Sequence, residues 1–167
     1  MASRHLGYLV ALLVFAVDQL TKWIVVGPLG IDQIGEQRWV LPFFNLTFTQ
    51  NLGISLGYFE ARSATGQWIL IAVTGAIAIG VAYWIGREKQ RGDQVALGMV
   101  LGGALGNILD RIRFGYVVDF ADLHFGEFRP FLVFNVGDAA ISIGVVILLL
   151  RAFLTRNERP EENIEHA

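Results

Sequence analysis

The chain has 167 residues, of which 54% are hydrophobic and 17% charged, and its mean hydropathy is +0.51. This composition is too apolar for an ordinary water-soluble domain of this length, and a net charge of −2 argues against a nucleic-acid partner. The absence of cysteine excludes disulfides, thiol catalysis and thiolate metal sites. His5, His124 and His166 lie far apart along the chain and no HExxH-type spacing occurs, so a metal site is not expected. The sequence implies no cofactor.

The first apolar segment, residues 6–26, follows a basic start in the manner of a cleaved export signal. No small-x-small cleavage site closes it, and three more apolar segments follow, so an uncleaved transmembrane helix is the better interpretation. Asp18 and Lys22 are four residues apart and would share one face of that helix, where an ion pair is expected.

Three further segments, residues 68–86, 95–112 and 136–154, approach the roughly 20 apolar residues that a spanning helix needs. The short loop at 87–93 carries Arg87, Lys89 and Arg91, which favours a cytoplasmic location for this loop and for both termini. The polar tail, about 156–167, is expected to be disordered. No repeat or second domain is visible, so residues 1–167 are expected to form one membrane-embedded domain.

The two long connections, about 27–66 and 113–134, would both emerge on the outer side. The stretch FFNLTFTQN alternates apolar and polar residues, which is typical of a half-buried strand. Two more extended pieces are expected around a turn at Gly126–Pro130. We therefore predict an integral membrane, mainly α protein with four transmembrane helices and a small β-rich cap. Trp39, Phe43 and Phe44 suit the membrane interface, where they could equally serve only as anchors.

The polar residues of the spans gather toward one depth on the outer side. Charged groups inside a bilayer cost several kcal/mol each and usually mark function. The residues concerned are Asp18, Lys22, Asn107, Asp110, Arg111, Asn135 and Asp138.

Two carboxylates lack an obvious local cation. Asp18 and Asp110 have cations nearby in the sequence, and Asp122 is expected at the surface, which leaves Asp119 and Asp138. Two carboxylates that share a site hold one proton between them, so one can activate water while the other polarises a peptide carbonyl, with no metal. The alternative for Asp138 is a simple helix N-cap, and the sequence leaves both interpretations open.

Five ordered segments, spread over nearly the whole chain, resemble the motifs of bacterial lipoprotein signal peptidase, also called signal peptidase II. They are VDQLTK (17–22), QNLGISLG (50–57), GNILDR (106–111), VVDF (117–120) and FNVGDAAI (134–141). The chain departs from the usual pattern at Gly137, where the family has Ala, and after the glycine of the second motif.

This resemblance implies an intramembrane aspartyl endopeptidase with Asp119 and Asp138 as its catalytic pair. It implies removal of the signal peptide from diacylglyceryl-modified prolipoproteins, just before the lipidated cysteine, in the bacterial inner membrane with the active site on the periplasmic side. It also implies contact with membrane lipids, inhibition by the peptide globomycin and a monomeric enzyme. Residues that would support the site or bind substrate are Asn107, Arg111, Asn135, Asn51, Gly53, Asp110, Asp18 and Lys22.

Other functions are weighed against this one. A Gly-x-Gly-Asp intramembrane protease would need glycine where NVGD has Asn135. An ion- or proton-coupled transporter would place its carboxylates near the midplane and often shows repeated halves. A non-catalytic assembly factor would use the charges only to hold helices together. Serine catalysis would depend on His124, and a lone loop histidine among aromatic residues is more often packed than catalytic.

Overall fold

The computed structural model describes residues 5–53 and 64–156, and within them four helices are long and apolar enough to cross a membrane. The helices are α1 (Leu6–Val26), α2 (Ala64–Arg87), α3 (Arg91–Phe114) and α4 (Val136–Arg156). The four expected spans are thus each found within a helix. The expected disorder of the tail falls on residues 157–167, which lie outside the described residues.

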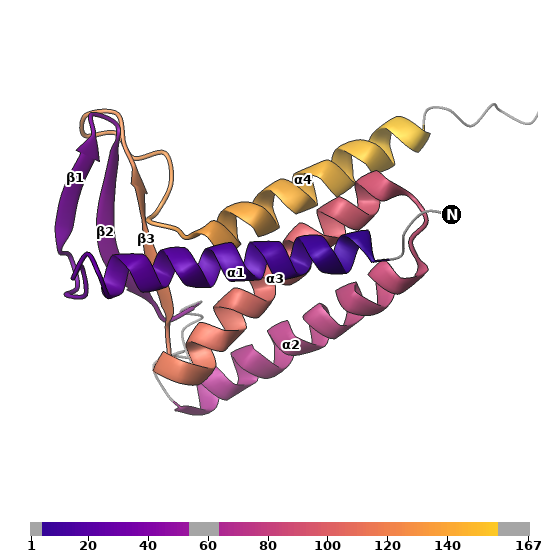
Figure 1. Ribbon diagram of the computed structural model, residues 1–167, viewed down its shortest axis with the longest axis horizontal. Helices are drawn as coiled ribbons and strands as arrows, with labels where there is room; N and C mark the ends of the chain where they lie inside the picture. The colour runs from indigo at the N-terminus through magenta and orange to yellow at the C-terminus, as the bar shows by residue number, and fades with distance from the viewer. Residues whose placement is uncertain (1–4, 54–63, 157–167) are drawn as a thin grey trace, which may run out of the picture.

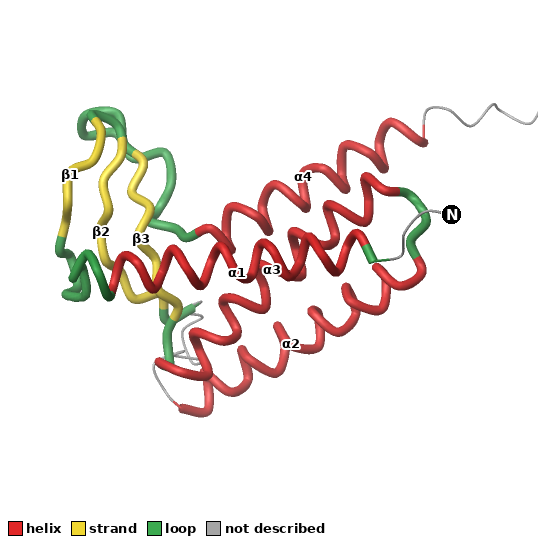
Figure 2. The backbone as a smooth tube through the Cα atoms, viewed as in Figure 1, coloured by secondary structure: helices red, strands yellow, loops and turns green. Residues whose placement is uncertain are grey.

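Three strands form an antiparallel sheet in the order β1-β2-β3: β1 (Gln37–Leu41), β2 (Phe44–Asn51) and β3 (Val117–Leu123). The sheet lies at one end of the helices, and the start of α1 and the end of α4 lie at the opposite end (Figures 1 and 2). The predicted class, a four-helix membrane protein with a small β-rich cap, is confirmed.

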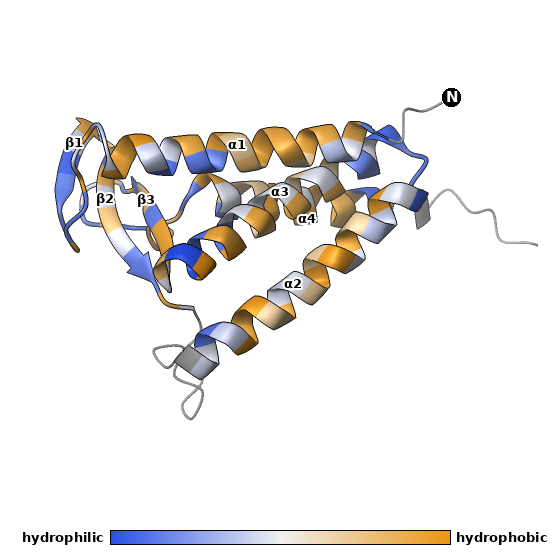
Figure 3. Ribbon diagram, turned by 60° about the horizontal axis from the view of Figure 1, so that its bottom comes forward, coloured by the Kyte–Doolittle hydropathy of each residue, from blue (hydrophilic) through white to orange (hydrophobic). Residues whose placement is uncertain are grey.

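Helix α3 is central, because it packs against α1, α2 and α4. Glycine permits this close packing: a Cβ on Gly102 would overlap the carbonyl of Ala11 in α1, and one on Gly103 would overlap the carbonyl of Gly137 in α4. Apolar residues run along α1 and α2, whereas the α2–α3 connection and much of the sheet are hydrophilic (Figure 3).

The sheet is fastened to the helices by an apolar cluster beneath it. Val25 at the end of α1 and Ile31 after it pack with Phe48 of β2 and with Val118 and Phe120 of β3. Helix α3 ends at Gly115, which has φ +78° and donates its N–H to the carbonyl of Arg111. This left-handed cap turns the chain directly into β3.

Two expectations for residues 113–134 are wrong. Only Val117–Leu123 forms a strand; the second extended piece is reduced to two isolated bridges, Ala121 with Phe134 and Phe125 with Phe128. Pro130 lies between them and has no N–H for a ladder. Asp122, expected at the surface, is 2% exposed and is held by Thr47 and Arg129.

Candidate active site

Asp119 lies in the middle of β3, opposite Thr49 of β2, and its side chain is 2% exposed. The turn at Gly115 brings the strand back against the end of α3, where the backbone N–H of Val118 donates to the Asp110 carboxylate at 3.1 Å. The position of Asp119 is therefore set on both sides of the strand, by the β2 pairing and by α3.

Asp138 lies in the first turn of α4 and forms a capping box with Asn135. The Asn135 Oδ1 accepts the N–H of Asp138 at 2.8 Å, and the Asp138 Oδ2 accepts the N–H of Asn135 at 3.3 Å. Such reciprocal bonds satisfy N–H groups that a helix start leaves without partners. The capping role considered from the sequence is therefore present, and it holds the carboxylate in place.

Asn135 also joins the two aspartates. Its Nδ2 donates to the Asp119 Oδ1 at 2.6 Å, while its backbone binds Asp138. The Nδ2 of Asn107, from α3, donates to the other oxygen of Asp138 at 2.8 Å. The structure therefore brings Asp119 and Asp138 to the same buried asparagine, although they come from a strand and a helix.

The pKa of Asp119 is raised from 3.8 to about 7, first because burial removes water from the carboxylate and second because Asp138 is a nearby negative charge. Hydrogen bonds from Asn51 and Asn135 and the charge of Lys22 oppose this rise. Around neutral pH this environment lets Asp119 exchange a proton, which is what acid–base catalysis requires.

A buried ion network supports the site from α1. Lys22 Nζ lies 2.8 Å from the carboxylate of Asp18 and 2.8 Å from that of Asp110, and it also donates to Asn107. The expected Asp18–Lys22 pair is present, and the cation bound to Asp110 is Lys22 rather than the adjacent Arg111. Asp18 further accepts the N–H of Gly137 at 2.8 Å, which ties α1 to the first turn of α4.

Gln19 is a member of this network that the sequence interpretation missed. Its Nε2 donates to Asp110 at 3.0 Å and to Asp18 at 3.2 Å. The available signal is its place beside Asp18 in a mostly apolar helix. A polar side chain there needs a partner, and Asp110 of α3 supplies it.

Three other predicted residues surround the pair. Asn51 accepts the N–H of Gly53 at 2.9 Å and hydrogen-bonds the Asp119 side chain. Gly53 has φ +93°, which favours glycine at this turn. Arg111 interacts electrostatically with Asp119 and Asp138, and its buried Nε has no hydrogen-bond partner among the described residues. Gly57 of the same motif lies outside the described residues.

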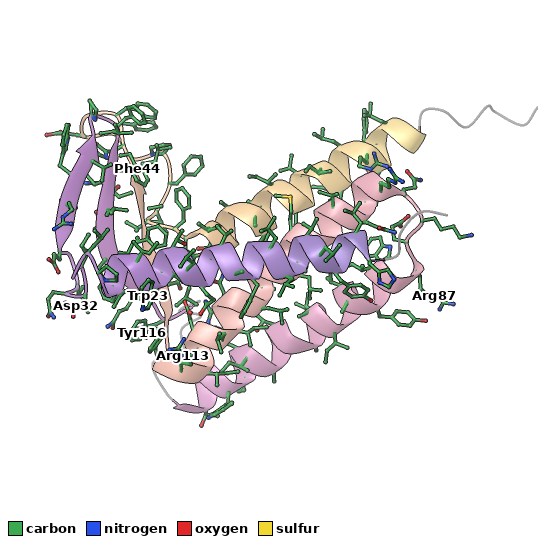
Figure 4. All side chains as sticks on the ribbon, in the orientation of Figure 1. Trp23, Asp32, Phe44, Arg87, Arg113 and Tyr116 are labelled. Carbon is green, nitrogen blue, oxygen red and sulfur yellow. The ribbon has the colours of Figure 1, made fainter. Side chains whose placement is uncertain are left out.

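A cavity of about 190 Å³ borders the ion network, lined in part by Lys22 and Asp110. Trp23, Arg113 and Tyr116 also line it and lie together where α1 and α3 meet the sheet (Figure 4). Neither Asp119 nor Asp138 is among the residues that line this cavity, so it is separate from the pair. Within residues 5–53 and 64–156, no group of three or more His, Asp or Glu side chains could hold a metal ion.

The chain is similar to known proteins along most of its length. The signal peptidase II family profile matches residues 10–154. The lipoprotein signal peptidase of Sphingopyxis alaskensis is 55% identical over 148 residues, covering 89% of this chain and 85% of that protein. The lipoprotein signal peptidase of Rhizorhabdus wittichii is 51% identical, covering 97% and 94%.

Solved structures agree with the sequence relatives. A bacterial membrane enzyme solved at 2.3 Å is 29% identical, has a TM-score of 0.77, and the match covers 95% of this chain and 94% of that one. The resemblance drawn from the five sequence motifs is therefore confirmed. A match along nearly the whole chain, in sequence and in fold, shows that this multi-pass membrane protein is a member of the signal peptidase II family.

Proposed function

We propose that this protein is an intramembrane aspartyl endopeptidase that cleaves diacylglyceryl-modified prolipoproteins just before the lipidated cysteine. Family membership makes it a protease that removes signal peptides from prolipoproteins, which disfavours the transporter and the assembly factor. The observation that carries the aspartyl mechanism is the shared asparagine: Asn135 bonds Asp119 through its side chain and Asp138 through its backbone.

In the mechanism, the pair begins with one proton. The ionised carboxylate takes a proton from a water molecule, whose oxygen attacks the scissile carbonyl carbon. The protonated carboxyl donates a hydrogen bond to the carbonyl oxygen, and a tetrahedral intermediate forms. When the C–N bond breaks, a carboxyl proton passes to the amine of the cysteine. The titration belongs to the pair, so the first proton is assigned to the pair and not to one aspartate.

The buried supports have defined parts in this reaction. Asn107 and Asn135 donate to the two carboxylates and keep them oriented, while Lys22 forms ion pairs with both Asp18 and Asp110 beside them. Because the donors and acceptors are already paired, little reorganisation is needed when charge moves during the reaction.

The membrane location suits the substrate. Lifting acyl chains out of a bilayer would cost about 0.8 kcal/mol per CH₂, so a lipidated cysteine is best cleaved beside the lipid. The pair lies where the sheet meets the helices, at the end opposite Arg87, Lys89 and Arg91, which are expected in the cytoplasm. We therefore place the active site at the periplasmic side of the bacterial inner membrane.

The direct test is a gel-shift assay with a purified diacylated prolipoprotein. Asp119→Asn and Asp138→Asn should each lower cleavage at least about a thousandfold, because each removes an acid–base group. The matched control is Asp122→Asn, a buried aspartate of the same strand that binds Arg129 instead of Asn135. The Asp122→Asn variant should retain cleavage activity. In the wild-type protein, globomycin should inhibit cleavage, as the family resemblance implies. Full activity of either aspartate variant would refute the mechanism.

A further inference from the structure

Beside Asp138 lies an apolar pocket of about 370 Å³ that the mechanism above does not use. One wall comes from the connection between β3 and α4, with Phe131, Leu132 and Phe134, and the other from the start of α4, with Asp138, Ser142 and Ile143. This connection lies between the sheet and the first turn of α4 (Figure 1). The pocket therefore begins at a proposed catalytic carboxylate.

The pocket extends from Asp138 into the membrane-spanning part of α4. Ile143 lies five residues beyond Asp138, which is about 7 Å along a helix. Ile143 is 50% exposed, and Val146, a turn further, is 52% exposed and continues the apolar surface. A molecule that leaves the pocket in this direction follows the exposed apolar side chains of a helix long and apolar enough to span a membrane.

The other wall is also apolar and open. Leu132 is 91% exposed and Phe131 is 61% exposed, and Phe131 packs edge-on against Phe134 at a centroid distance of 6.4 Å. Large apolar side chains exposed beside a catalytic group point to a ligand with apolar parts.

We propose that this pocket binds one acyl chain of the diacylglyceryl group on the substrate cysteine, an inference that rests on the function proposed above. Because cleavage occurs just before that cysteine, the lipid is only a few covalent bonds from the scissile peptide bond, which must lie next to the aspartates. The direction of the pocket distinguishes the acyl chain from a peptide side chain. An amino-acid side chain of the substrate peptide would stay at the membrane depth of Asp119 and Asp138, whereas the pocket extends from Asp138 along α4 toward the bilayer interior.

The test uses one peptide carrying thioether-linked diacylglycerol with either long or short acyl chains. For the wild-type protein, KM should be lower for the long chains. Ser142→Phe fills the pocket from an exposed position and should raise KM for the long-chain substrate about tenfold, the loss expected when about two methylenes leave an apolar site. The KM for the short-chain substrate and kcat for both should stay within about twofold.

The matched control is Val73→Phe, which adds the same ring at an exposed position of α2, outside the pocket. It should preserve the dependence on chain length. The proposal is overturned if Ser142→Phe affects long and short chains equally, or if Val73→Phe affects the long-chain KM as much. It is also overturned if the preference for the residue before the cysteine changes instead. Ile143→Trp is a second variant that fills the pocket. If the Ser142→Phe protein does not fold, Ile143→Trp takes its place and should show the same selective rise in KM for the long-chain substrate.

A second measurement is independent of kinetics. A long-chain substrate analogue with a photoreactive diazirine in one acyl chain should label residues 131–143 of the wild-type protein. Labelling confined to other segments would overturn the pocket assignment while cleavage still supports the proposed function. If the wild-type protein cleaves no lipidated precursor at all, the proposed function fails, and the acyl site fails with it.

Discussion

Asn135 is the residue on which the site depends most, because it is both a helix cap and a bridge. Its side-chain Oδ1 accepts the N–H of Asp138, and its side-chain Nδ2 donates to Asp119, Asn107 and the backbone carbonyl of Val118. Helix initiation and carboxylate orientation thus depend on the same side chain. Neither aspartate can shift far without breaking a bond that also stabilises the fold.

The raised pKa of Asp119 leads to a prediction about pH. The Asp119 carboxyl titrates near pH 7 in the folded protein and near 3.8 in the unfolded chain, so ionising it opposes folding. The contribution of the protonated carboxyl to folding stability is therefore complete below about pH 4 and is lost as the pH rises toward 7. We expect kcat/KM to fall above about pH 7, when the pair loses its proton. Asn51→Ala removes a bond that lowers the pKa of Asp119, and the alkaline limb should move to higher pH.

The control for this pH profile is Gln50→Ala, the neighbouring residue of β2, whose profile should match the wild type. A limb that stays in place in Asn51→Ala, or moves to lower pH, would contradict the role given to that hydrogen bond.

Asp18 should affect stability and activity together. Asp18→Ala removes the bond to Lys22 and the bond to the N–H of Gly137, and breaking a buried ion pair costs about 3–5 kcal/mol. Asp18→Asn retains an acceptor for Gly137 and should lose less of both. Thermal melting in detergent and the cleavage assay together check this. Unchanged melting with lost activity in Asp18→Ala would show that Asp18 acts in catalysis alone.

At the scale of the elements, the site depends on how closely α3 approaches its neighbours. The backbone of Gly103 lies against that of Gly137, and Gly106 faces the Asp18 carboxylate with no room for a Cβ. These contacts bring α1, α3 and the start of α4 close enough for Asp18, Asn107 and Asp138 to share one network.

Adding one methyl group to α3 should therefore separate it from α4. Gly103→Ala should destabilise the protein by about 1–3 kcal/mol and reduce cleavage, because its Cβ meets backbone that cannot move aside easily. Gly75→Ala, in α2, is the matched control: a Cβ there meets nothing within 4 Å, and Ala favours a helix over Gly. Equal effects of the two variants on melting would refute the packing argument.

The sequence predicts some of these elements well. The helices follow from long apolar runs, and β2 follows from its alternation, since both signals are local. The bridging role of Asn135 and the pairing of Lys22 with Asp110 depend on how segments distant in the sequence pack. Asp122 was misplaced for the same reason: its burial depends on Thr47 of β2 and on Arg129, neither of which a local pattern can place.

At the scale of the molecule, the sheet and the start of α4 lie at one end of the helices and the α2–α3 loop at the other (Figure 1). Asp119 belongs to β3 and Asp138 to the first turn of α4, so both lie at the sheet end. We expect the sheet end to face the periplasm, because the loop carries Arg87, Lys89 and Arg91. The natural chain has no cysteine, so single cysteines can report each side. In intact spheroplasts an impermeant maleimide should label Gln33→Cys, while Lys89→Cys should react only after lysis. The reverse pattern would invert the topology.

The Asp18–Lys22 pair has a consequence for how the protein is made. Both residues belong to α1, four positions apart, so their bond can form as soon as this first helix is wound, before Asp110 has been synthesised. An unpaired charge costs up to about 2.5–3.5 kcal/mol in an inserting helix, at the helix centre, and mutual neutralisation reduces the cost for this pair. When α3 later enters the bilayer, Lys22 also binds Asp110, and the contact that eased insertion becomes part of the assembled enzyme.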